Sequence, residues 1–239
     1  MSKGKDIALS MNTDTSSDWT IIQISDTHLM DQADHTFAGM NPEQSFHIVM
    51  EHLTHHYSTP DAIIHTGDLA QVPVQETYSR YLQYMQTLNI PHYQIPGNHD
   101  DRAVFPFHLQ QDQAHLLSFG QWRIVLLNSA VVDQVDGWIS EAQLTQLDQI
   151  LSAHPEQHVI IACHHHPFAM QSLWIDQHKL KNSTHLMHVI AKHQNVKVVL
   201  YGHVHQDSSN EWHGVQFLST PSTSIQFKPQ SDTFALDES

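Results

Sequence analysis

Short apolar runs rich in Ile, Val and Leu recur along this chain and alternate with longer amphipathic segments. The runs are Trp19–Ile24, Asp61–Thr66, His92–Ile95, Trp122–Leu127, His158–Cys163, Val196–Tyr201 and Val215–Leu218. Almost uninterrupted apolar runs of this length are typical of strands that are buried on both faces. The pattern therefore predicts a core built largely from buried parallel strands.

The intervening segments have helical character, and they are Pro42–Tyr57, Val74–Leu88, Ser140–Leu151 and Lys179–His193. Asn41 precedes Pro42, which favours a helix start, because Asn caps helices well and Pro fits their first turn. Ser140 and Gln143 have the spacing of a capping box. Strands that alternate with helices indicate right-handed βαβ units, so we expect an α/β fold.

The sequence contains no linker, repeat or low-complexity tract, so residues 19–239 are expected to form one domain. Residues 1–18 are polar and rich in Ser and Thr, and we expect a flexible N-terminal tail there. This leader has no apolar segment like those of secretory signals, and no run in the chain approaches a membrane span. Because Cys163 is the single cysteine, no internal disulfide forms, which suits a cytoplasmic protein.

The net charge of the chain limits the classes of partner that we expect it to bind. The chain has 25 Asp and Glu against 10 Lys and Arg, a formal net charge of −15. Without a basic stripe it is not expected to bind nucleic acid, and we expect no membrane partner either. A small phosphoester remains compatible with this charge, because bound cations reverse the sign of the local field.

Five short polar blocks follow the ends of predicted strands. They are Asp26-Thr-His28, Gly67-Asp68, Gly97-Asn98-His99-Asp100, His164-His165-His166 and Gly202-His203-Val-His205. In open α/β sheets the binding crevice forms outside the carboxyl ends of the strands, so these blocks are expected to converge. All their candidate ligands are oxygen or imidazole nitrogen, and none is sulfur.

The spacing within the blocks supports a site for two metal ions. Asp26 and His28 are two residues apart, as are His203 and His205, so in extended chain each pair points to one side. The carboxylate of Asp68 has two oxygens and is able to bridge two cations. We therefore predict a dinuclear metal centre and, as its chemistry, hydrolysis of a phosphoester.

These blocks resemble those of the calcineurin-like metallophosphoesterase superfamily and, more narrowly, of the class III 3′,5′-cyclic-nucleotide phosphodiesterases that act on cyclic AMP. The resemblance covers the chain from about Trp19 onward. It is carried by Ile24–Leu29, His65–Ala70, Pro96–Asp100, Cys163–Pro167, Trp174–His178, Tyr201–Gln206, Thr220–Thr223 and Gln226–Pro229. The fold implied is a four-layer α/β/β/α sandwich with two central mixed sheets.

The resemblance also implies residue roles. Asp26, His28 and His205 would hold one metal, Asn98, His164 and His203 the other, and Asp68 would bridge them. Asn98, His99 and His203 would contact the phosphate, with His99 protonating the leaving oxygen and Asp100 orienting His99. The ions implied are two divalent metals, iron or manganese or both. His165 is the alternative to His164, because relatives often have His-His-Pro-Pro where this chain has His164-His165-His166-Pro167.

The implied reaction is hydrolysis of 3′,5′-cyclic AMP to 5′-AMP by metal-activated hydroxide. Two alternatives stay open: another small phosphodiesterase or phosphomonoesterase, acting on 2′,3′-cyclic nucleotides or glycerophosphodiesters, and a catalytically silent metal-binding regulator. The chain stops at Ser239, where relatives usually continue for further strands. A sheet edge or apolar patch left open in this way would favour a homodimer.

Overall fold

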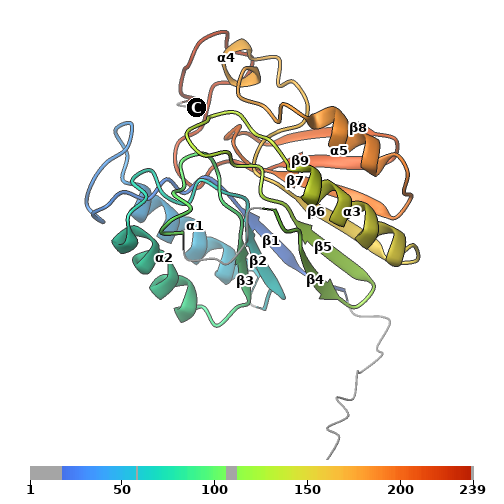
Figure 1. Cartoon of the computed structure of the whole chain (residues 1–239). Helices are drawn as coiled ribbons and strands as arrows, with labels where there is room; N and C mark the ends of the chain where they lie inside the picture. The colour runs from blue at the N-terminus through green and yellow to red at the C-terminus, as the bar shows by residue number, and fades with distance from the viewer. Residues whose placement is uncertain (1–17, 58, 106–111, 238–239) are drawn as a thin grey trace, which may run out of the picture.

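The computed structural model describes residues 18–57, 59–105 and 112–237 (Figure 1). Almost all of the expected N-terminal tail, residues 1–17, lies outside the described residues. Within the described part of the chain, no helix is both long and apolar enough to span a membrane.

The first half of the chain builds a small parallel sheet. Its strands, in the order β1-β2-β3, are β1 (Ile21–Ile24), β2 (Ala62–His65) and β3 (His92–Gln94). Two helices join them, α1 (Pro42–His56) and α2 (Gln75–Thr87), and the side chain of Asn41 caps α1 as predicted. Ile24 pairs with His65 and His65 with Gln94, so the three strands end at one level.

The second half builds a larger mixed sheet in the order β4-β5-β6-β7-β9-β8. Its strands are β4 (His115–Phe119), β5 (Trp122–Leu126), β6 (His158–Ala162), β7 (Val196–Tyr201), β8 (Ser208–Trp212) and β9 (Val215–Ser219). The strands β5, β6, β7 and β9 run parallel, whereas β4 and β8 run antiparallel to their neighbours. The helices of this half are α3 (Glu141–Ala153), α4 (Leu173–Asp176) and α5 (Ser183–Ile190).

The two sheets face each other, with α1 and α2 on one outer face and α3 and α5 on the other (Figure 1). Alternating side chains of each strand enter different layers. Ile63 packs in the cluster that contains α1 and α2 residues, whereas Ile64 packs between the sheets. Likewise Val125 faces the layer of α3 and α5, and Leu126 faces the other sheet. This is the expected four-layer sandwich, although the described strands of the smaller sheet are parallel rather than mixed.

Three elements were not anticipated from the apolar pattern. The edge strand β8 has the sequence Ser-Ser-Asn-Glu-Trp, whose polar residues suit a strand with one neighbour rather than two. The strand β4 and the single-turn helix α4 are also short and partly exposed.

The helix expected over Lys179–His193 begins later, at Ser183. Leu180 instead forms an isolated bridge with Gly137, and Lys181 N–H donates to the Gly137 carbonyl at 2.9 Å. The side chain of Asn182 then bonds the backbone of Ile139 on both its N–H and its carbonyl. Pairing with this loop keeps the segment extended, which local helical periodicity does not reveal.

Replacing Ile64 by Ala is expected to lower the free energy of unfolding by about 2–5 kcal/mol, because Ile64 is fully buried between the sheets. Urea denaturation measures this change. Ile48→Ala is the matched control, since Ile48 is 58% exposed on α1 and its truncation should cost less than about 0.5 kcal/mol. Equal costs for the two variants would contradict the assigned inter-sheet core.

Candidate metal centre

The predicted ligand blocks lie together at the carboxyl ends of strands from both sheets. Five of the predicted residues have left-handed backbone there: Asp26 (φ 55°), His28 (48°), Asp68 (54°), His203 (70°) and His205 (48°). Positive φ is uncommon for residues with a side chain, and it persists where the surroundings fix it. Backbone N–H groups of Asp26 and His28 donate at 3.0 Å to the carbonyls of Gly67 and Asp68, which lock two of these blocks together.

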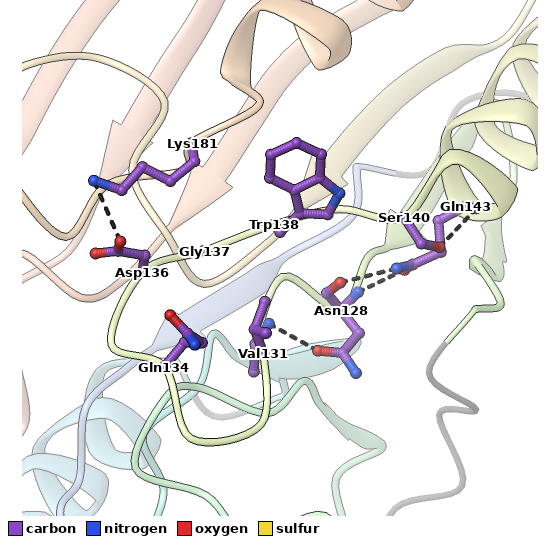
Figure 2. Close-up of a pocket in the computed structure, with 10 residues that line it drawn as sticks. Asn128, Val131, Gln134, Asp136, Gly137, Trp138, Ser140, Gln143 and Lys181 are labelled. Atoms are coloured by element: carbon purple, nitrogen blue, oxygen red, sulfur yellow. Dashed lines mark hydrogen bonds and ion pairs between the residues drawn. The ribbon is translucent and has the colours of Figure 1, made fainter.

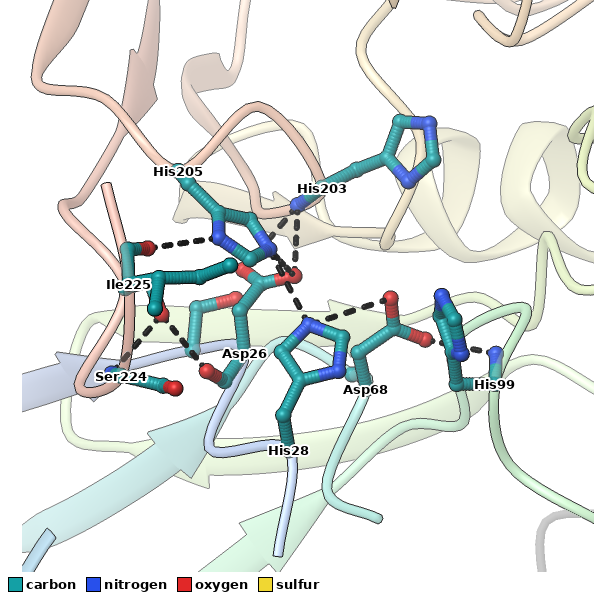
Figure 3. Close-up of polar contacts among 12 residues, drawn as sticks. Asp26, His28, Asp68, His99, His203, His205, Ser224 and Ile225 are labelled. Carbon is teal, nitrogen blue, oxygen red and sulfur yellow. Dashed lines mark hydrogen bonds and ion pairs between the residues drawn. The ribbon is translucent and has the colours of Figure 1, made fainter. Parts of the chain in front are cut away.

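The first cluster contains Asp26, His28 and His205, all buried (Figure 3). His28 Nδ1 donates to Gln71 Oε1 at 2.9 Å, and His205 Nδ1 donates to the Ile225 carbonyl at 2.7 Å. Both Nε2 atoms therefore point into the cluster, and they face each other at 3.1 Å, with Asp26 Oδ1 3.3 Å from that of His205. Imidazole nitrogens and a carboxylate that converge in this way are the donor set of a divalent cation.

His28 carries no second ring proton that would offset the electron-rich atoms gathered in this cluster. Burial lowers the pKa of His28 to about 3, so its imidazole is neutral in the metal-free protein at ordinary pH. Neutral imidazole is the form that binds metals. The first cluster thus fits a cation without rearrangement of its hydrogen bonds.

The second cluster is built around His164. Its Nδ1 donates to the Thr66 carbonyl at 2.7 Å, so its Nε2 is directed at Asn98 Oδ1, 3.2 Å away, and at Asp68 Oδ2, 3.3 Å away. Burial opposes a positive charge on His164, but the carboxylate of Asp68 outweighs it and raises the pKa to about 9. In the metal-free protein a proton therefore occupies the position between these atoms.

His203 completes the second cluster. Its Nε2 atom is buried without a hydrogen-bond partner among the described residues, and its ring centre lies 5.1 Å from that of His164. Figure 3 shows its imidazole pointing away from Asp26 and His28. The expectation that His203 and His205 point to one side is therefore wrong, because both residues have left-handed rather than extended backbone. Buried polar atoms normally have a bonding partner, and a cation beside His164 would provide one for His203 Nε2.

Asp68 lies between the two clusters. One carboxylate oxygen, Oδ2, is 3.3 Å from His164 Nε2 and 3.8 Å from His28 Nε2. The other oxygen, Oδ1, accepts the backbone N–H of His99 at 2.8 Å. The exposed ring of His99 is 4.9 Å from that of His28, at the open side of the centre.

Glycines make this close approach possible. A Cβ atom at Gly97 would lie 2.1 Å from Asp68 Oδ1, and one at Gly67, where φ is +101°, would lie 2.4 Å from His164 Nδ1. Neither distance leaves room for a side chain. The Gly of the Gly-Asp and Gly-Asn-His-Asp blocks is thus required by packing against the ligands themselves.

Asp100 has a different place from the one expected. It accepts hydrogen bonds of 2.9–3.1 Å from the backbone N–H groups of Leu69, Ala70 and Gly97 and from the Tyr78 hydroxyl. These bonds tie the Gly-Asp block to the Gly-Asn-His-Asp block, whereas no described contact joins the carboxylate of Asp100 to the ring of His99. Burial, together with the charge of Asp68, raises the pKa of Asp100 to about 6.

His165 has both ring nitrogens engaged by the protein. Its Nε2 donates to the Val135 carbonyl at 3.1 Å. Ser129 Oγ accepts the backbone N–H groups of His164 and His165, so its own proton is directed at His165 Nδ1, 2.8 Å away. With no free lone pair in this arrangement, His165 is a less suitable ligand than His164.

Sequence reasoning missed the residues that orient these imidazoles, namely Gln71, Ser129, Thr66 and Ile225. Ser129 and Gln71 carried a weak signal, since each lies a few residues beyond a predicted strand end, like the ligand blocks themselves. Thr66 and Ile225 accept these hydrogen bonds through their backbone carbonyls. Every residue type has such a carbonyl, so the sequence does not reveal this role.

The calcineurin-like phosphoesterase family matches residues 20–207 of the chain. The 3′,5′-cyclic adenosine monophosphate phosphodiesterase CpdA of Haemophilus influenzae is 38% identical over 91% of this chain and 81% of its own length. A 3′,5′-cyclic-nucleotide phosphodiesterase of Nostoc is 37% identical over 92% of this chain and 84% of its own length.

Solved structures share the fold at much lower identity. A dimetal phosphatase from Danio rerio has a TM-score of 0.68 and 16% identity, with 91% of each chain covered. The purple acid phosphatase PPD1 of yellow lupin has a TM-score of 0.64 and 14% identity, over 92% of this chain and 46% of that one. The family match and the close relatives agree with the metal-binding donor set, and the chain belongs to the calcineurin-like phosphoesterase family of metal-dependent hydrolases.

Proposed function

We propose that the chain hydrolyses 3′,5′-cyclic AMP to 5′-AMP at two divalent cations. The observation that carries this proposal is the carboxylate of Asp68, which stands between two groups of inward-facing imidazole nitrogens. A shared carboxylate between two cation sites is the arrangement expected for in-line phosphoester displacement. The choice of substrate is supported by relatives that are named as cyclic AMP phosphodiesterases and align with 91% of this chain.

The proposed ligands are Asp26, His28 and His205 for one cation, Asn98, His164 and His203 for the other, and Asp68 for both. Iron and manganese are the proposed ions, because they accept nitrogen and oxygen ligands of this kind without thiolate. Cations bound there would draw in the phosphate oxygens and lower the pKa of the attacking water.

The chain's own residues then position and protonate the substrate. Asn98, His99 and His203 are proposed to contact the phosphate. The ring of His99 is exposed at the open side of the centre and is free to approach the ribose 3′-oxygen as it leaves. Because Asp68 fixes the backbone of His99 and Asp100 fixes the loop beneath it, the imidazole is presented from a rigid support.

The two alternatives make different demands on this site. A silent regulator needs the fold and the metals but has no need of His99, whose exposed ring therefore favours catalysis. Other small phosphoesters would use the same ligands, and substrate comparison separates them. The cytoplasmic location, the homodimer and the absence of nucleic-acid and membrane partners stay predictions.

Comparison of substrates tests the proposed function directly. The manganese-loaded and iron-loaded full chain should show its highest kcat/KM for 3′,5′-cyclic AMP among that substrate, 2′,3′-cyclic AMP, a glycerophosphodiester and a simple monoester. Chelation should abolish hydrolysis, and Asp68→Ala should reduce it at least about a hundredfold. A metal-loaded protein that is inert on all four substrates would identify a regulator instead, and a higher kcat/KM for another ester would replace the substrate.

The choice between His164 and His165 predicts different metal contents. At saturating manganese, His164→Ala should bind close to one ion per chain, because it removes the Nε2 atom next to Asp68 and Asn98. His165→Gln should retain close to two ions per chain, even where activity falls, because its nitrogens bond Ser129 and Val135. Metal analysis after gel filtration measures both, with His115→Ala, at an exposed position on β4, as the control. The reverse result would make His165 the ligand.

Metal affinity should depend on pH through His164. Its pKa of about 9 in the metal-free protein means that a proton must leave before a metal binds. Affinity for the ion beside Asn98 should therefore fall by up to about tenfold for each unit that the pH drops below 9, and should level off above it. Titration calorimetry in buffers of different ionisation enthalpy measures the released proton. Uptake of manganese without proton release at pH 7 would contradict this prediction.

A further inference from the structure

A cavity of about 700 Å³ opens beside the metal centre. One wall is the segment Gly97–Ala103, which includes Asn98 and His99, and the other is the loop Ala130–Val135. The cavity is large enough for a small organic ligand, and most such ligands bind in cavities of this size. Since Asn98 and His99 also belong to the proposed phosphate site, a ligand whose phosphate lies on the metals would extend into this space.

The loop Ala130–Val135 is braced on several sides, so the cavity is already formed in the free protein. Asn128 Oδ1 accepts the Ala130 N–H at 2.9 Å, and the backbone of Asn128 is itself bonded by the Gln143 side chain (Figure 2). At the other end, His165 bonds the Val135 carbonyl, and the next residue, Asp136, pairs with Lys181 at 3.3 Å. A preformed wall lowers the entropic cost of binding.

The lining of the cavity combines apolar surface with hydrogen-bonding groups. The side chains of Val132 and Val135 are 60% and 48% exposed, which leaves apolar faces for a flat ring to cover. Gln134 adds an exposed amide, and Asp101 and Asp133 add exposed carboxylates. Amides and carboxylates accept hydrogen bonds from an exocyclic amino group, whereas the carboxylates repel any further phosphate.

Arg102 contributes the one guanidinium group among the residues that line the cavity. One terminal nitrogen, Nη2, donates to the Ala130 carbonyl on the opposite wall. The other, Nη1, is buried without a hydrogen-bond partner among the described residues. Once the guanidinium turns toward the cavity, a ring nitrogen or sugar oxygen of a bound ligand would satisfy this donor.

We infer that this cavity binds the nucleoside part of the substrate, with an amino-bearing purine against Val132 and Val135 and with Arg102 as a specificity-determining residue. This inference rests on the proposed function, since it places the cyclic phosphate on the metal centre. It selects a nucleotide with one phosphate and a base that carries an amino group. Nucleotides with additional phosphates are disfavoured by Asp101 and Asp133.

The test compares 3′,5′-cyclic AMP with ribose 3′,5′-cyclic phosphate, which has the same leaving group and no base. The manganese-loaded wild-type chain should show a KM at least about tenfold lower for cyclic AMP, the effect of one hydrogen bond from a charged group. Arg102→Met and Val132→Asp should each bring the two KM values within about threefold. Their kcat for the base-free substrate and their metal content should match the wild type.

Arg123→Met and Ile48→Asp serve as matched controls, because Arg123 bonds only the nearby backbone of its own hairpin in the described contacts and Ile48 is exposed on α1. Val132 is itself well exposed, so its variant tests the cavity even where Arg102→Met fails to fold. Equal losses on both substrates, or a wild type that prefers neither, would overturn the nucleoside site while leaving hydrolysis intact. A wild type that hydrolyses neither cyclic phosphate would overturn the proposed function itself.

Discussion

The metal centre depends on where three imidazoles place their Nδ1 protons. His28, His164 and His205 each donate from Nδ1 to an oxygen held by the fold, in Gln71, Thr66 and Ile225. Their Nε2 atoms are then directed at Asp26 and Asp68, and those of His28 and His205 also face each other. Such an arrangement is electrostatically unfavourable without a positive charge at its centre, which a proton on His164 supplies in the metal-free state and divalent cations supply far better.

Much of the fold and the site was predictable because both depend on strand ends. The buried strands β5, β6 and β7 are largely apolar runs, and the five polar blocks follow such runs closely, so the sequence alone predicted that the ligands lie near one another. The edge strand β8 and the extended segment before Ser183 were not predictable, because tertiary pairing rather than local composition determines them.

Neighbouring residues of one block illustrate the same limit within the site. His164 and His165 are indistinguishable by type, and only the hydroxyl of Ser129 and the carbonyl of Val135, far away in sequence, separate their roles. Similarly, the sequence suggests that Asp100 is a partner of its neighbour His99. In the folded protein, its carboxylate instead accepts hydrogen bonds from the Gly67–Ala70 loop. The residue types in the five polar blocks indicated the chemistry of the site. The role of each single residue depends on its hydrogen bonds, which only the structure shows.

The proposed ligands are divided between the two sheets: Asp26, Asp68 and Asn98 follow strands of the smaller one, and His164, His203 and His205 follow strands of the larger one. A cation held by His28 and His205 would join residues 177 positions apart. It would then act as a removable cross-link that closes a very long loop, in the manner of a disulfide. Metal would then join the two halves of the sandwich at this edge, in addition to the hydrogen bonds and the apolar packing that already connect them. Loss of the ions would therefore remove a constraint on the unfolded chain and lower the stability of the junction between the halves.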